Sequence, residues 1–136
     1  MERVTKIEWY IIFTDQEVGP HWLHFLLKKG FYHCYLFRQI GDYVYYANPR
    51  LSNIDTKIYQ SMSIDQLADD LRSQPNTKIL KFKYPFDFNN QMFNTWNLVP
   101  TCVSVVKMFL GIRARAQTPY QLYKHLLKKG AVPFNY

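Results

Sequence analysis

Cys102 is the residue of this chain best placed for nucleophilic chemistry. Pro100 and Thr101 precede it and an apolar segment follows, an order typical of the start of a buried helix. A thiol at the first helical position lies against unpaired backbone N–H groups and the positive end of the helix dipole, and both favour the thiolate. The same N–H groups can stabilise the oxyanion that forms when the sulfur attacks a carbonyl. We therefore predict that Cys102 is a nucleophile.

A general base for this thiol must come from another part of the chain. The sequence offers four histidines: His21, His24, His33 and His125. His33 is the best placed, because it lies within a predicted strand whose rigid backbone can hold an imidazole against a helix terminus. The next strand ends in Asn48, which can orient the ring by hydrogen bonding. Cys34 follows His33, and the alternation of a strand predicts that it points to the opposite face and takes no part in the site.

Both of these residue types also have a structural interpretation. Free cysteine is among the most buried residue types, and a cysteine in an apolar helix is commonly a small core residue. A strand histidine flanked by Tyr32 and Tyr35 is commonly a core residue with satisfied hydrogen bonds. The residue types alone leave catalysis and core packing open for Cys102 and His33.

The elements that must position these residues begin with a central antiparallel sheet. Segments rich in β-branched and aromatic residues predict its strands, and Gly41-Asp42 predicts a tight hairpin between two of them. The predicted strands cover residues 8–14, 31–38, 43–48 and 77–84, with a further short strand at 57–61.

Helix-end signals predict the helices. Ser63–Gln66 and Thr118–Gln121 match capping boxes, and Gly30 and Gly111 suit positions just after a helix end. The Cys-bearing segment contains three valines, which favour a strand by propensity, but its end signals favour a helix packed on one face of the sheet. The predicted helices cover residues 21–29, 63–72, 102–110 and 119–129.

The composition predicts one soluble α+β domain over residues 1–136. This length suits a single domain, and 48% hydrophobic and 18% aromatic residues can form its core. An apolar run of about 20 residues, as a membrane-spanning helix needs, is absent, and so is the apolar stretch of a signal peptide. We therefore expect a protein made in the cytoplasm. Two cysteines predict neither a disulfide framework nor a zinc site, and no metal or cofactor is expected.

The net charge of +7 is concentrated in the C-terminal part of the chain. Residues 101–136 contain six Lys or Arg and no acidic residue. This pattern predicts a positive surface on residues 107–129 that binds polyanions weakly. The alternative is a solvated helix face that only aids solubility.

The order of these motifs resembles circularly permuted papain-like proteins, which include permuted NlpC-type hydrolases and small phage-encoded relatives. The resemblance rests on His33 within Gly-Phe-Tyr-His-Cys-Tyr-Leu-Phe, on Ala-Asn-Pro at the end of the next strand, and on Thr-Cys-Val-Ser-Val-Val-Lys at a helix start. These motifs lie in residues 30–49 and 96–127. The chain departs from the family at Thr101, where relatives often have Asn, and at Tyr46 or Asn48, where many have an acid or His.

The resemblance implies a permuted papain-like domain and a thiol hydrolase that cleaves amide or ester bonds through an acyl-enzyme. Carried over to this chain, His33 is the base, Cys102 the nucleophile and Asn48 the third member. Peptidoglycan and acyl-linked molecules are the substrate classes that it suggests.

Two other functions remain open. A non-catalytic virion or assembly protein on the same scaffold would explain 11 Tyr and 10 Phe, since surplus aromatic residues are common at interfaces. A basic nucleic-acid-binding module would use Tyr120 and Tyr123 as stacking groups among the cations. These two tyrosines share a stripe with Leu127, however, which is more typical of a core face.

Overall fold

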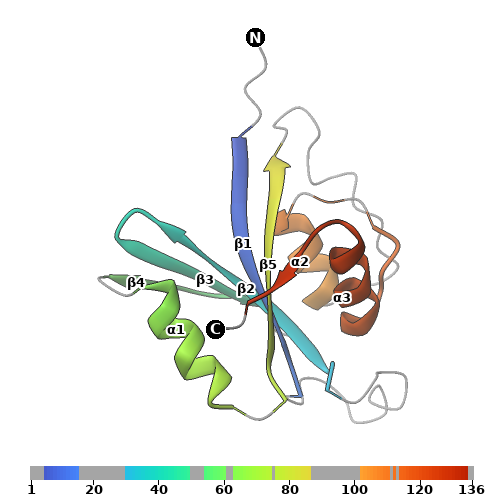
Figure 1. The fold of residues 1–136 in the computed structure, drawn as a ribbon, viewed down its shortest axis with the longest axis horizontal. Helices are drawn as coiled ribbons and strands as arrows, with labels where there is room; N and C mark the ends of the chain where they lie inside the picture. The colour runs from blue at the N-terminus through green and yellow to red at the C-terminus, as the bar shows by residue number, and fades with distance from the viewer. Residues whose placement is uncertain are drawn as a thin grey trace.

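A computed structural model describes residues 5–15, 30–49, 54–60, 63–74, 76–86, 102–110, 112 and 114–134, and these form an α+β fold. Within them, six strands form one antiparallel sheet: β1 (Thr5–Thr14), β2 (His33–Ile40), β3 (Tyr43–Pro49), β4 (Ile54–Gln60), β5 (Lys78–Phe86) and β6 (Val132–Pro133). Their order in the sheet is β4-β3-β2-β1-β5-β6. The helices are α1 (Ile64–Arg72), α2 (Cys102–Leu110) and α3 (Pro119–Lys128) (Figure 1).

The predicted strands are confirmed, with small shifts at their ends. The predicted hairpin connects β2 to β3, with Ile40 opposite Tyr43. Gly41 in its turn has φ 58°, the left-handed conformation that glycine adopts without steric cost. The short strand predicted at 57–61 begins earlier, at Ile54, and pairs with β3 along its length. The predicted helix at 21–29 lies outside the described residues.

The two predicted capping boxes are present. Ser63 Oγ accepts a hydrogen bond from the Gln66 backbone N–H at 3.2 Å, and the Gln66 side chain accepts one from the Ser63 N–H at 2.9 Å. Thr118 and Gln121 make the same reciprocal pair at the start of α3. The caps predicted for α2 at Thr101 and Gly111 lie outside the described residues.

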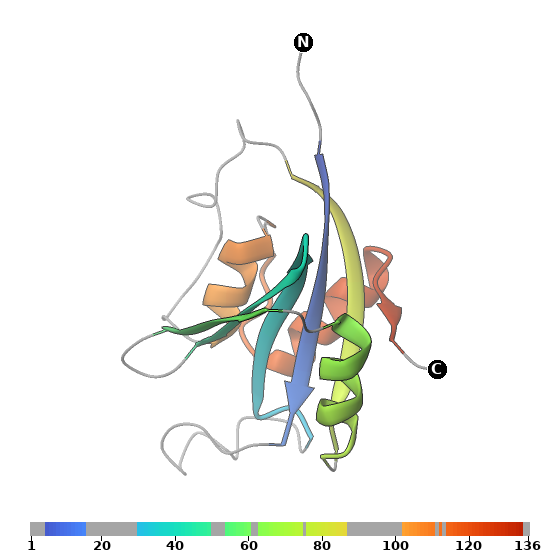
Figure 2. The ribbon, with the colours of Figure 1, turned by 90° about the vertical axis from the view of Figure 1, so that its left-hand side faces the viewer.

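The sheet separates two apolar layers, because successive strand residues point to opposite faces. One layer packs under α1, and the other packs under α2 and α3 (Figures 1 and 2). The α1 layer contains Tyr10, Ile12, Tyr35, Phe37, Val44, Leu67 and Leu71. The α2 and α3 layer contains Ile11, Phe13, Cys34, Leu36, Ala47, Val103, Val106, Leu110, Leu122 and Leu126.

The prediction of a positive surface over residues 107–129 is wrong at Lys107, because this side chain is buried. This residue of α2 is 0% exposed, and its Nζ donates hydrogen bonds to the backbone oxygens of Ala114 at 3.1 Å and Ala116 at 2.8 Å. A buried ammonium is tolerated when such acceptors replace its water. Burial lowers the pKa of Lys107 from its ordinary value. Lys107 therefore fastens segment 114–116 to α2 and contributes nothing to the surface.

The remaining described cations of the C-terminal segment are exposed. These are Arg115, Lys124, Lys128 and Lys129. The prediction of a positive surface therefore holds for residues 115–129 as far as exposure is concerned, and its binding to polyanions stays a prediction.

Candidate active site

Cys102 is the first residue of α2, and the helix behind it is anchored in the core. Val103 and Val106 are buried in the same apolar layer as Leu36 and Ala47, and α2 packs on β2 and β3. This packing holds the N-terminal end of α2 against the beginning of β2. Cys102 itself is partly exposed, whereas Cys34 is buried.

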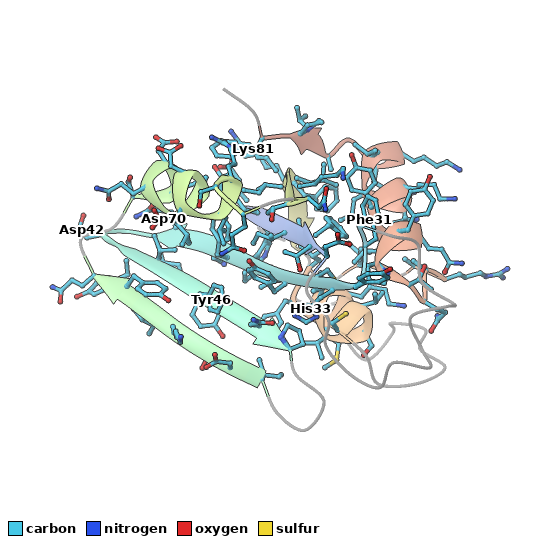
Figure 3. The ribbon with its side chains drawn as sticks, turned by 90° about the horizontal axis from the view of Figure 1, so that it is seen from below. Phe31, His33, Asp42, Tyr46, Asp70 and Lys81 are labelled. Atoms are coloured by element: carbon cyan, nitrogen blue, oxygen red, sulfur yellow. The ribbon has the colours of Figure 1, made fainter. Side chains whose placement is uncertain are left out.

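His33 is the first residue of β2 and is 2% exposed. Leu36 on β2 lies opposite Ala47 on β3, so the residues next to them, Tyr35 and Asn48, share the other face of the sheet. His33 is two residues from Tyr35 and therefore points to the same face as Asn48. His33 Nε2 lies 2.6 Å from Asn48 Oδ1, and Asn48 Nδ2 donates a hydrogen bond to Tyr46 Oη at 2.9 Å. Figure 3 shows His33 next to α2, with Tyr46 further along β3.

The hydrogen bond to Asn48 determines which nitrogen of His33 carries the proton. An amide oxygen is only an acceptor, so the Nε2–H group of His33 donates to Asn48 Oδ1. In the neutral ring this leaves Nδ1 without a hydrogen and able to accept one. The imidazole therefore has one nitrogen held by Asn48 and a second nitrogen able to accept a hydrogen bond or a proton.

Cys102 is hydrogen-bonded to the His33 side chain, to the Cys34 thiol and to the Cys34 backbone N–H. The hydrogen bond from the Cys34 thiol lowers the pKa of Cys102 well below its ordinary value, and the hydrogen bond and charge of His33 lower this pKa further, against the opposing effect of burial. Burial raises the pKa of Cys34 well above its ordinary value. Of the two thiols, Cys102 is therefore the one that loses its proton more readily.

The prediction that Cys34 takes no part in the site is wrong. Strand alternation does hold, since Cys34 lies in the α2 layer while His33 faces the same side as Asn48. Cys102, however, lies beside the first residues of β2, where side chains from both faces of the sheet can reach it. Alternation excludes a shared site above the middle of a sheet, but not at the end of a strand.

The structure brings Cys102, His33 and Asn48 together and separates them from His125. That histidine lies on α3, and its pKa is lowered by burial and by the nearby charges of Lys129, Lys128 and Lys107. His21 and His24 lie outside the described residues. Tyr46 was not identified from the sequence as a hydrogen-bond partner of Asn48. A signal was present, because residues two apart on one strand point to the same face of the sheet.

The described part of the chain contains neither a cluster of possible metal ligands nor a helix that could span a membrane. There, no group of three or more His, Cys, Asp or Glu side chains is arranged to hold a metal ion. Among the same residues, none of the helices has the length and apolar character needed to span a bilayer.

Comparisons with protein-family models, curated proteins and solved structures found no match to this chain. A functional assignment must therefore come from the geometry at the beginning of α2.

Proposed function

We propose that this protein is a cysteine hydrolase that cleaves amide or ester bonds, with Cys102 as nucleophile, His33 as general base and acid, and Asn48 as the residue that orients the imidazole. The observation that carries the proposal is the hydrogen-bonded chain from Cys102 through His33 to Asn48 at the N-terminal end of a helix. A nucleophile, a base and an orienting group in contact form the arrangement that thiol acyl transfer requires.

The first half of the reaction is acyl transfer to sulfur. The Cys102 thiolate attacks the substrate carbonyl carbon, and the first backbone N–H groups of α2, which have no acceptor within the helix, stabilise the oxyanion. The carbonyl then re-forms and the C–N or C–O bond breaks. The His33 imidazolium gives its Nδ1 proton to the leaving amine or alcohol, and Cys102 is left as a thioester.

The second half releases the acyl group. Neutral His33 takes a proton from a water molecule, and the resulting hydroxide attacks the thioester carbonyl. The C–S bond breaks, so that the carboxylic acid leaves and the Cys102 thiolate is restored beside the His33 imidazolium. Asn48 holds the ring in one orientation through both halves, because its hydrogen bond is on the nitrogen that does not exchange protons.

The same residues support a circularly permuted papain-like architecture as part of this proposal. The chain order is histidine, asparagine, cysteine, and the helix that carries the cysteine covers one face of an antiparallel sheet. Peptidoglycan and acyl-linked molecules are the substrate classes that we propose to test first.

The proposal is tested with an activated ester, p-nitrophenyl acetate, and with intact-protein mass spectrometry. The wild-type protein is expected to show an acyl adduct on Cys102 and turnover, and Cys102→Ala is expected to lose both. Circular dichroism of each variant checks the fold. Equal turnover by wild type and Cys102→Ala, with no adduct on Cys102, would remove the proposal.

An assembly protein on the same scaffold is the second candidate, and edge strand β4 favours it. Ile54 and Ile58 on this strand are 45% and 67% exposed, and exposed apolar side chains on a sheet edge are typical of pairing surfaces. Virion association would belong to this candidate. If Cys102→Ala leaves association with partner proteins intact while Ile58→Lys abolishes it, the second candidate is favoured.

Nucleic-acid binding receives less support. The rings of Tyr120 and Tyr123 each pack against Phe31, with centroids 5.0 Å apart in both pairs. Both rings therefore pack against the apolar layer under α3, which favours a core role over stacking on bases.

A further inference from the structure

The two thiols of the chain are in contact, although they come from distant parts of the sequence. Cys34 lies on β2 and is buried in the apolar layer under α2, and Cys102, the first residue of α2, packs against that layer within hydrogen-bonding reach of the Cys34 thiol. The chain contains two cysteines, so an intramolecular disulfide can only join these two. The proposed hydrolytic mechanism has no step for the Cys34 thiol.

We propose that Cys102 is an oxidation site for hydroperoxides and that Cys34 is its resolving thiol, so that oxidation ends in a reversible Cys34–Cys102 disulfide. The inference rests on the proposed function for one consequence, the loss of hydrolysis on oxidation. Formation of the disulfide itself depends only on the two thiols and on His33.

The exposure of the two sulfurs determines the order of events. Cys102 is partly exposed, whereas Cys34 is 0% exposed and lies within the apolar layer under α2. A peroxide from solvent therefore meets Cys102 first. The thiolate is the form that reacts with peroxides, and of the two thiols Cys102 forms it more readily.

The first step makes a sulfenic acid. The Cys102 thiolate attacks the terminal oxygen of the hydroperoxide, the S–O bond forms and the O–O bond breaks. The departing alkoxide takes a proton from the His33 imidazolium and leaves as an alcohol, or as water when the oxidant is hydrogen peroxide. The sulfur has lost two electrons and the peroxide has gained them.

The second step makes the disulfide. Neutral His33, or a water molecule, takes the proton of the Cys34 thiol, and the Cys34 sulfur attacks the sulfenic sulfur of Cys102. The S–S bond forms, the S–O bond breaks, and the leaving hydroxide recovers the proton to give water. In sum, two thiols and one hydroperoxide give one disulfide, one alcohol and one water.

The consequence for the site is protection of its nucleophile. A sulfenic acid left without a partner is oxidised further to a sulfinic acid, which thiol reductants do not reverse. A neighbouring thiol that already touches the sulfenic sulfur diverts it into a disulfide, which dithiothreitol reduces. The disulfide also occupies the Cys102 sulfur, so the oxidised protein cannot form an acyl-enzyme.

The test treats the native protein with one equivalent of hydrogen peroxide, then denatures it and blocks free thiols with N-ethylmaleimide. In the wild type we expect loss of both free thiols, a monomer on non-reducing gels, a peptide pair linking Cys34 to Cys102, and full recovery of the thiols with dithiothreitol. Cys34→Ser is the matched variant, in which we expect dimedone-reactive Cys102 and, with excess peroxide, sulfinic acid. Cys102→Ser should keep its Cys34 thiol.

Wild-type protein that accumulates sulfinic acid on Cys102 as fast as Cys34→Ser does, with Cys34 still free, would overturn the inference. The wild-type peptide map alone decides this if Cys34→Ser fails to fold, because a free Cys34 beside oxidised Cys102 already contradicts a resolving role. The experiments can contradict the proposed hydrolysis and the proposed disulfide formation independently of each other. A protein that forms the disulfide but no acyl adduct loses the proposed function and keeps the inference.

Discussion

The two ends of α2 both carry hydrogen-bonded polar side chains, and their partners differ in kind. Lys107 donates to the backbone oxygens of Ala114 and Ala116, which neither take up nor release protons at ordinary pH. Cys102 contacts His33, and an imidazole is a side chain that can accept and donate protons. The first arrangement can only hold the chain in place, whereas the second can also carry out chemistry. The difference teaches that the partners of a polar group decide whether it can only hold the chain or can also react.

The largest expected effect comes from His33→Ala, which removes the titrating partner. Acyl transfer to Cys102 should fall about 10²- to 10⁴-fold, as expected for the loss of a general base. The pH midpoint of Cys102 alkylation by iodoacetamide should also rise toward about 8.5, the value of an ordinary thiol. The midpoint should rise because hydrogen-bond donors, His33 among them, lower the pKa of Cys102 in the wild type. Removing a donor makes the thiolate less stable, so a higher pH is needed to form it.

Alkylation kinetics across pH, with the labelled peptide identified, check this prediction. Because the hydrogen bond from the Cys34 thiol is the largest cause of the lowered Cys102 pKa, part of this lowering should remain in His33→Ala. It should shrink further in the double variant with Cys34→Ala, in which the backbone N–H of residue 34 still donates to Cys102. An unchanged midpoint in both variants would mean that neither residue stabilises the thiolate.

The next largest effect concerns the other end of α2. Lys107→Met keeps an apolar stem but leaves the backbone oxygens of Ala114 and Ala116 without their buried donor, which should cost about 2–4 kcal/mol in the free energy of unfolding. Urea unfolding measures it. Lys83→Met, at an exposed position on β5, is the control and should change stability by less than about 0.5 kcal/mol. The pH midpoint of Cys102 alkylation should stay where it is, unlike in His33→Ala.

Asn48→Ala should have a smaller effect on catalysis. His33 keeps its contact with Cys102 but loses the hydrogen bond that fixes its ring, so acyl transfer should fall about tenfold to a hundredfold. Asn48→Gln and Asn48→Asp test whether an acceptor at this position is sufficient. If acyl transfer by Asn48→Ala equals that of wild type, Asn48 has no orienting role.

The smallest effect should come from Tyr46→Phe. This change removes only the hydroxyl that accepts the hydrogen bond from Asn48, so acyl transfer should fall about two- to fivefold through weaker positioning of the amide. Steady-state hydrolysis of p-nitrophenyl acetate is sensitive enough to measure it. A loss as large as that of Asn48→Ala would place Tyr46 closer to the chemistry than we propose.

Local signals in the sequence predicted most of the described elements. The capping boxes at Ser63 and Thr118 and the turn at Gly41 act within four residues, so the sequence around them determines their geometry. The order of the sheet has no such signal. β1 lies between β2 and β5, and β6 pairs with β5, through contacts between distant segments that apolar patterning does not specify.

In the candidate site, too, the residues with local sequence signals were predicted and those that depend on contacts between distant segments were missed. Cys102 and His33 were identified from the element that each occupies, and Asn48 from its place at the end of a paired strand. The role of Cys34 could not be found that way, because it depends on where α2 meets β2. The burial of Lys107 was missed for a related reason: a lysine in an apolar helix is assigned to the surface unless the segment that supplies its acceptors is known to fold back onto it.

The position of β1 has a consequence for how the protein matures during its synthesis. β1 through β4 leave the ribosome in order, but β1 must still wait for β5 to pair along its other side, and Cys102 emerges after β5. Pairing between segments so distant in sequence is slow relative to local hairpin formation. Cys102 therefore cannot contact His33 and Cys34 until α2, which follows β5 in the chain, has packed on β2. The time course of thiolate formation at Cys102 should then report the final stage of folding.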